Sequence, residues 1–178
     1  MYEKTFPNKR FRLTLQFLKK HIDKSESILD LGVKNPFAEI MISEGYNVEN
    51  TKGEDLDEDH STIENSDAKV ITAFEIFEHL LSPYEVLKSI KANKLVISVP
   101  LRLWFASAYR SEHDKWDRHY HEFEDWQLDW LLEKTGWRII DSAKWTNPVK
   151  KFGIRPILRR LTNRYYIVYA ERSPNNNH

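Results

Sequence analysis

The amino-acid sequence predicts an α/β fold with a doubly wound, mostly parallel sheet and an antiparallel last strand. Short apolar runs of strand length recur along the chain, and segments with helical periodicity separate them. Glycine or proline stands at several of the junctions. Strands that alternate with helices form βαβ units, in which parallel strands are covered on both faces.

The elements follow in order along the chain. Apolar positions within 13–22 indicate an amphipathic leading helix, and residues 27–31 (SILDL) form a short buried strand. Asn35 and Pro36 suit the N-cap and first position of a helix that ends at Gly45. Residues 52–68 and 102–120 are expected to be irregular. The other expected elements are strands at 46–51, 68–74, 94–100, 137–145 and 164–172, helices at 83–91 and 123–135, and a basic helix between the last two strands.

Composition limits the classes of function. The 178 residues suit one domain, residues 1–172, followed by a polar tail at 173–178. A net charge of zero gives no global field that would attract nucleic acid or a membrane. The absence of cysteine excludes disulfides, thiolate zinc sites and cysteine nucleophiles. The N-terminal stretch lacks the continuous apolar core of a signal peptide or membrane span, so we expect a cytoplasmic protein.

Charge is unevenly distributed along the chain. Residues 49–67 carry eight acids and one lysine, a pattern typical of a solvated face. Residues 142–170 carry seven basic residues and no acid, and apolar residues at helical spacing interleave with the arginines. This basic segment either binds an anionic acceptor or forms a solvated helix whose aliphatic face packs on the sheet. The apolar residues are Ile154, Ile157, Leu158 and Leu161.

Several polar residues follow predicted strands, at the edge of the sheet where ligands bind in such folds. The stretch FEIFEHL, residues 74–80, places Glu75, Glu78 and His79 on one face of a helix or turn. Such residues can simply flank a helix start, where the dipole favours acids, or they can form a site. Nearby aromatic residues either line an acceptor pocket or cover the end of the sheet: Trp104, Phe105, Tyr109, Trp116 and Tyr120.

Three segments occur in the order used by class I S-adenosylmethionine-dependent methyltransferases: ILDLG, AFEIFEHLLSPYEVL and HEFEDWQLDWLLEKTGW. The chain resembles that family, and its type 11 members, over roughly residues 25–142, which implies a Rossmann-like fold and S-adenosylmethionine as cofactor. The sequence departs from the family where Lys34 and Pro36 replace two further glycines, so loss of cofactor binding stays open. By resemblance the cofactor-binding residues are Asp30 and Gly32 for the methionine part, Glu49 for the ribose, Asp55 for the adenine, and Phe74.

The ExxEH element with a later histidine is similar to that of ubiquinone-biosynthesis O-methyltransferases and of RNA 2′-O-methyltransferases. The resemblance implies a divalent metal (Mn, Fe or Zn) held by Glu75, Glu78, His79 and His121. Alternatively, His79 or His121 is a general base without a metal, with Glu75 also catalytic. The implied reaction is O-methylation of a small or lipid- or sugar-linked, anionic acceptor, with RNA less favoured. The rival interpretation is a non-catalytic methyltransferase-like domain that acts as a scaffold.

Overall fold

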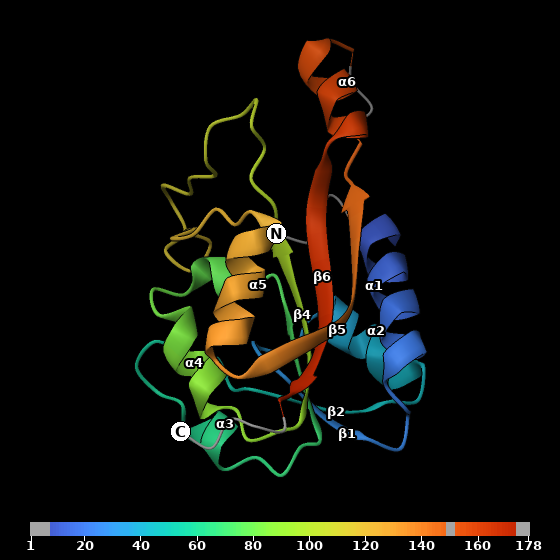
Figure 1. Cartoon of the computed structure of the whole chain (residues 1–178), viewed down its shortest axis with the longest axis vertical. Coiled ribbons are helices and arrows are strands. Elements are labelled where there is room, and N and C mark those ends of the chain that lie inside the picture. Colours follow the sequence, from blue (N-terminus) through green and yellow to red (C-terminus); the bar gives the residue numbers. More distant parts are fainter. Residues whose placement is uncertain (1–7, 149–151, 174–178) are drawn as a thin grey trace.

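The fold is a six-stranded mixed sheet with helices on both faces (Figure 1). The computed structural model describes residues 8–148 and 152–173, so most of the predicted polar tail lies outside the described residues. The strand order is β2-β1-β3-β4-β6-β5. The strands are β1 (Ser27–Asp30), β2 (Asn47–Asn50), β3 (Val70–Phe74), β4 (Lys94–Pro100), β5 (Trp137–Thr146) and β6 (Asn163–Arg172).

The predicted fold class is confirmed. Strands β2, β1, β3 and β4 are parallel, whereas β6 pairs antiparallel with both β4 and β5. The helical segments are α1 (Asn8–His21), α2 (Pro36–Ser43), α3 (Ser61–Glu64), the 3-10 turn η1 (Phe77–His79), α4 (Pro83–Ser89), α5 (Asp125–Lys134) and α6 (Ile154–Leu161). Residues 52–68, expected to be irregular throughout, contain the single helical turn α3, which buries Ile63.

Two apolar cores hold the sheet, one on each face. Helices α1 and α2 cover one face with Phe17, Leu18 and Met41, while α4 and α5 cover the other with Leu87 and Leu128. Side chains alternate between the two faces along each strand, so the central parallel strands are apolar on both sides. Among the helices of the described residues, none combines the length and apolarity that crossing a membrane requires.

The strand order reverses between β1 and β3, because the chain leaves β1 toward β2 and returns beyond β1 to form β3. Ligands of open α/β sheets bind outside the carboxyl ends of the strands at such a reversal. We use "the rim" for this edge, formed by the residues that follow β1, β3 and β4. Helix α6 and the loop after β4 project from the same end of the molecule (Figure 1).

Candidate functional site

Asp30, the last residue of β1, is buried and fully engaged by its neighbours. The Thr72 hydroxyl donates to Oδ1 at 2.6 Å, and the Asn50 side-chain amide donates to Oδ2 at 3.1 Å. Burial outweighs these hydrogen bonds and raises the pKa of Asp30 to about 7. The structure therefore places this carboxyl within the sheet, where it joins β1, β2 and β3.

Gly32 lies on the rim just beyond Asp30 and has a φ of 101°, which a side chain would strain. An added Cβ would lie 3.1 Å from Ile76 Cδ1, so a side chain at residue 32 would be crowded as well as strained. The Gly32 N–H donates to the Thr51 hydroxyl at 2.7 Å, and the Asn50 amide donates to the Gly32 carbonyl at 3.2 Å. These bonds from the end of β2 hold the loop in place.

Helix α2 begins as the sequence predicts. The Asn35 side chain accepts hydrogen bonds from the N–H groups of Phe37 at 2.9 Å and Ala38 at 3.1 Å, and Pro36 follows it. Lys34 points outward near Glu39, with 4.0 Å between the charged atoms. The loop therefore reaches α2 through a side-chain cap in place of a run of glycines.

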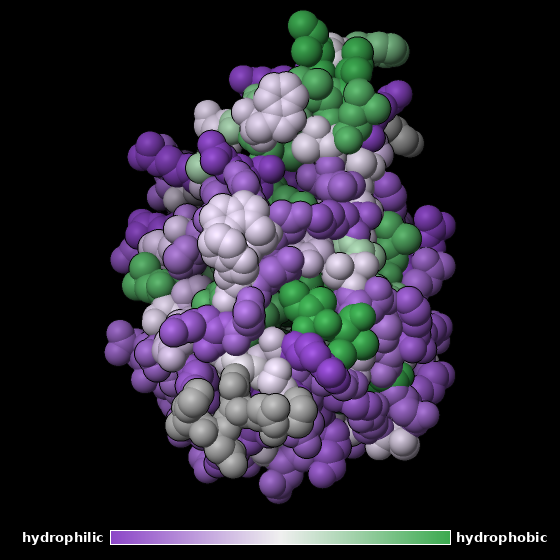
Figure 2. Space-filling view, in the orientation of Figure 1, coloured by the Kyte–Doolittle hydropathy of each residue, from purple (hydrophilic) through white to green (hydrophobic). Residues whose placement is uncertain are grey.

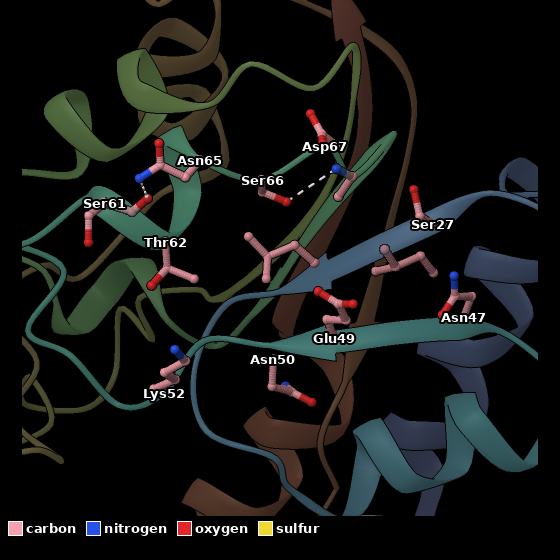
Figure 3. Close-up of a pocket in the computed structure, with 13 residues that line it drawn as sticks. Ser27, Asn47, Glu49, Asn50, Lys52, Ser61, Thr62, Asn65, Ser66 and Asp67 are labelled. Atoms are coloured by element: carbon pink, nitrogen blue, oxygen red, sulfur yellow. Dashed lines mark hydrogen bonds between the residues drawn. The ribbon is translucent and has the colours of Figure 1, made fainter.

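Glu49 lies on the opposite face of the sheet from Asp30. Glu49 pairs with Leu29 and Asn50 with Asp30, and alternate residues of a strand point to opposite faces. Figure 3 shows Glu49 and Asn50 directed to opposite sides of β2. Glu49 lines an open cavity of about 640 Å³ between β1, β2 and α3, whose other lining residues are mostly polar. The structure thus separates two residues that the resemblance assigns to one cofactor.

Asp55 and Asp57 organise the loop between β2 and α3. Asp55 accepts from the Asp57 N–H at 3.1 Å, while Asp57 accepts from the N–H groups of Leu81 and Ser82, both at 2.8 Å. Asp57 thus ties this loop to the start of α4, and Asp55 supports the turn. The structure places Asp55 in a local turn.

Glu75 follows β3 with a φ of 58°, the only positive φ at a non-glycine position in the part of the chain that the structure describes. Its side chain accepts from Ser98 Oγ at 3.0 Å and forms an ion pair with Arg10 of α1 at 3.2 Å. Burial raises the pKa of Glu75, an effect that Arg10 and Ser98 oppose. The strained backbone thus turns a partly buried carboxylate toward α1.

Glu78, His79 and His119 form a compact group, here called the Glu78 cluster. One ligand atom from each lies within 4.8 Å of the others. Glu78 Oε1 is 3.7 Å from His79 Nε2, and the two imidazole rings meet edge to face with centroids 4.8 Å apart. His119 arrives from the loop after β4, because the N–H groups of Tyr120 and His121 both donate to the Glu78 carbonyl.

Two polar atoms of the Glu78 cluster are buried without a hydrogen-bond partner in the described part of the chain, although one of them, His119 Nδ1, lies 3.7 Å from Glu122 Oε1. His79 Nδ1 lies 2.9 Å from the Arg118 carbonyl, so Nδ1 carries the proton and Nε2 of the neutral ring has a lone pair. Glu78 Oε2 and His119 Nδ1 are buried without a hydrogen-bond partner among the described residues. Burial, and then the Glu75 carboxylate, raise the pKa of Glu78 well above its usual range. Burial and His79 lower the pKa of His119 to about 4.

His121 and Phe74 lie outside this cluster. His121 Nε2 is 3.4 Å from the Leu81 carbonyl, and its ring lies against Phe123 with centroids 5.6 Å apart. Phe74 packs edge to face on Phe37, at a centroid distance of 5.1 Å. The structure thus brings two of the four proposed metal ligands, Glu78 and His79, together with His119. Because His119 and His121 alternate along the chain, the sequence alone does not distinguish them.

The rim is closed above Glu75. A cavity of about 20 Å³ is left there, lined by Arg10, Phe11 and Thr14 of α1 together with Asn35, Phe37, Phe74, Glu75 and Ser98. Ligand pockets of proteins typically measure about 300–1,000 Å³, so this space is too small for an adenosyl group. The N–H and carbonyl of Gly32 are already hydrogen-bonded to Thr51 and Asn50, and α1 lines the small cavity next to the start of α2. The space above Glu75 has room for part of this cofactor only if the first turns of α1 move away.

A larger cavity, about 450 Å³, opens beside the Glu78 cluster. His119 belongs to the cluster and also lines this cavity. The other lining residues come from the same loop after β4: Tyr109, Arg110, Ser111, Glu112, Arg118 and Tyr120. The loop after β4 thus forms a pocket next to the Glu78 cluster. Arg10 and His119 contribute to the site although sequence reasoning did not select them, and for Arg10 no local pattern indicated its role.

Comparisons with known proteins place the fold. No protein family model matches the chain, and no curated protein matches it. Similar solved structures include a chain of the complex that contains the Haloferax volcanii Trm112 methyltransferase activator (TM-score 0.66, 10% identity, 96% of this chain and 93% of the other). Another is Burkholderia thailandensis 1,6-didemethyltoxoflavin-N1-methyltransferase with bound S-adenosylhomocysteine (TM-score 0.61, 15% identity, 92% and 78%).

The cyclase SpnF is also similar (TM-score 0.65, 11% identity, 97% of this chain and 85% of that chain). The fold is therefore the one found in S-adenosylmethionine-dependent methyltransferases, and a protein named as a cyclase shares it. At these identities the likeness concerns the fold, and function has to be argued from the site.

Proposed function

We propose that the chain is an S-adenosylmethionine-dependent methyltransferase that acts on a hydroxyl group of a small or lipid- or sugar-linked, anionic acceptor. One observation carries the proposal: within a methyltransferase-like fold, the Glu78 cluster follows β3 on the rim and reaches the 450 Å³ cavity through His119. An acceptor in that cavity would meet the ring of His119, whose pKa burial lowers to about 4, so the imidazole is neutral at pH 7. A neutral imidazole can take the proton of a hydroxyl during its attack.

As an alternative to the general base, we propose that the Glu78 cluster binds a divalent metal such as Mn²⁺, Fe²⁺ or Zn²⁺, with His119 as a ligand in place of a base. Glu78 Oε2 and His119 Nδ1 are buried without hydrogen-bond partners in the described ranges, with His119 Nδ1 3.7 Å from Glu122 Oε1, and buried polar atoms without hydrogen bonds are costly. Mixed carboxylate and imidazole donors suit these ions better than Mg²⁺. A bound metal would lower the pKa of the hydroxyl group that receives the methyl. The Arg118 carbonyl would orient His79 by accepting its Nδ1–H.

A matched pair of variants tests the metal proposal. We expect Mn²⁺ at about 100 times its Kd to stabilise the protein by about 2.7 kcal/mol in thermal denaturation. His119→Ala should lose that stabilisation, because His119 belongs to the cluster. His121→Ala should retain it if His121 stays on the Leu81 carbonyl. Stabilisation that depends on His121 and not on His119 would favour the ligand set expected from the resemblance, and none in the wild type would refute the metal.

Cofactor binding is tested with S-adenosylhomocysteine. The proposal requires the Arg10–Glu75 ion pair to open, because α1 fills the space above Glu75. We therefore expect isothermal titration calorimetry to detect binding to the wild type and tighter binding to Arg10→Ala, since the closed form loses an ion pair. Arg138→Ala, which removes an exposed arginine on β5, is the control and should bind as the wild type does.

The second candidate function is a non-catalytic scaffold with this fold. It is favoured by the 20 Å³ cavity and by Asp30, whose carboxyl is already satisfied by Thr72 and Asn50. Absence of binding in both the wild type and Arg10→Ala would refute the methyltransferase proposal and support the scaffold.

A further inference from the structure

Helix α6 presents its apolar side to solvent, the reverse of an ordinary surface helix. Its sequence, IRPILRRL, is strongly amphipathic, and none of its residues is buried. Ile154 is 79% exposed, Ile157 58% and Leu161 77%, and the adjoining Phe152 is fully exposed. We call these four residues the α6 patch. Of the four apolar residues at helical spacing, Leu158 alone is half-buried, so most of this aliphatic face does not pack on the sheet.

The α6 patch lies at a projecting end of the molecule. Helix α6 connects β5 to β6 and stands clear of the sheet (Figure 1). Figure 2 shows apolar surface at that end of the molecule. Contiguous apolar patches of this kind on a protein surface mark interaction sites, because exposing them to water is unfavourable.

The charges around the patch indicate what covers it. Arg155, Arg159 and Arg160 lie on the other side of α6, and residues 142–170 contain seven basic residues without one acid. An apolar helix face bordered by arginines is complementary to a bilayer with anionic headgroups, in which the apolar face enters the interface while the cations contact the lipid charges. A protein partner would need an acidic rim around an apolar groove, and the second copy of this chain offers the same basic charge.

A second segment supports the same orientation. The loop after β4 rises at the end from which α6 projects (Figure 1). It carries Trp104 and Trp116, which are 72% and 73% exposed. Tryptophan side chains favour the interface between headgroups and acyl chains.

We propose that the α6 patch docks the protein reversibly onto an anionic membrane surface, with the rim facing the lipid. The docking does not depend on methyl transfer and would hold equally for a non-catalytic domain. A single short helix with a few arginines gives a weak, salt-sensitive attachment.

The experiment is co-sedimentation of the full chain with vesicles of phosphatidylcholine alone or mixed with phosphatidylglycerol. We expect binding to the mixed vesicles only, weakened by added salt. Ile157→Ser should reduce affinity about tenfold, because a buried isoleucine side chain supplies that much transfer free energy. Ile140→Ser is the matched control, since Ile140 is an exposed isoleucine on β5, and it should bind as the wild type does.

The charge contribution has its own matched pair. Arg159→Gln with Arg160→Gln should weaken binding about tenfold or more, because each basic residue near an anionic surface contributes substantially. Lys88→Gln with Lys91→Gln removes the same charge next to the start of β4, at the opposite end of the sheet, and should have little effect. Vesicle binding that is absent, or equal in all four variants, would overturn the proposal. So would a dimer in sedimentation velocity that Ile157→Ser dissociates, with no vesicle binding.

Discussion

Replacing Asp30 with asparagine should change how the stability of the protein depends on pH. The pKa of Asp30 is raised from 3.8 to about 7 because the carboxyl is buried. Between these values the folded state keeps a proton that the unfolded state releases, so wild-type stability falls as pH rises from about 4 to about 7. A pKa difference of about 3 units corresponds to about 4 kcal/mol, an upper limit to the loss. The asparagine side chain is isosteric and does not titrate.

The assay is urea denaturation of wild type and Asp30→Asn at intervals from pH 4 to pH 8. Shared titrations cancel in the difference, so the variant should gain stability relative to the wild type by up to about 4 kcal/mol across the range. Asp23→Asn is the control: hydrogen bonds from Ser25 lower the pKa of the exposed Asp23 below 3.8, so its titration lies below the assayed range and its difference should stay nearly constant from pH 4 to pH 8. A difference for Asp30→Asn that does not change with pH would refute the reasoning.

Three further predictions concern the packing around the rim. Asn35→Ala removes the cap of α2, whose oxygen accepts two N–H groups, and should cost about 1 kcal/mol in urea denaturation; no measurable loss would contradict the capping role. Phe77→Ala empties a fully buried site and should cost about 3–5 kcal/mol by the same measurement, a smaller loss indicating that the core collapses into the space. Asp57→Ala should speed hydrogen exchange at the N–H groups of Leu81 and Ser82, and unchanged protection would show that the carboxylate does not hold them.

The fold follows from local features that the sequence displays directly. The apolar runs at β1, β3 and β4 lie between polar or turn-forming residues, and the Asn35–Pro36 pair marks the start of α2 unambiguously. Helix α3 escaped prediction because a single turn has no periodicity to detect, and its only buried side chain is Ile63. The placement of the α6 face also escaped, because an amphipathic pattern does not say whether its apolar side meets protein.

The site is less predictable because it depends on contacts between distant segments. Glu78 and His79 share one turn, so their proximity is a local property that spacing can indicate. The choice between His119 and His121 is made by the path of the loop after β4, where hydrogen bonds to the Glu78 carbonyl set which ring faces inward. Arg10 reaches Glu75 across 65 positions of sequence, a separation at which no spacing rule applies.

The left-handed backbone at Glu75 has an evolutionary consequence. A glycine there would relax the chain, yet it would also delete the carboxylate that Arg10 and Ser98 hold. Backbone stability therefore favours glycine at residue 75, whereas the contacts of the carboxylate favour glutamate. A lineage in which the carboxylate has no role would be free to replace Glu75 with glycine. A lineage that uses the carboxylate has to keep the strained backbone.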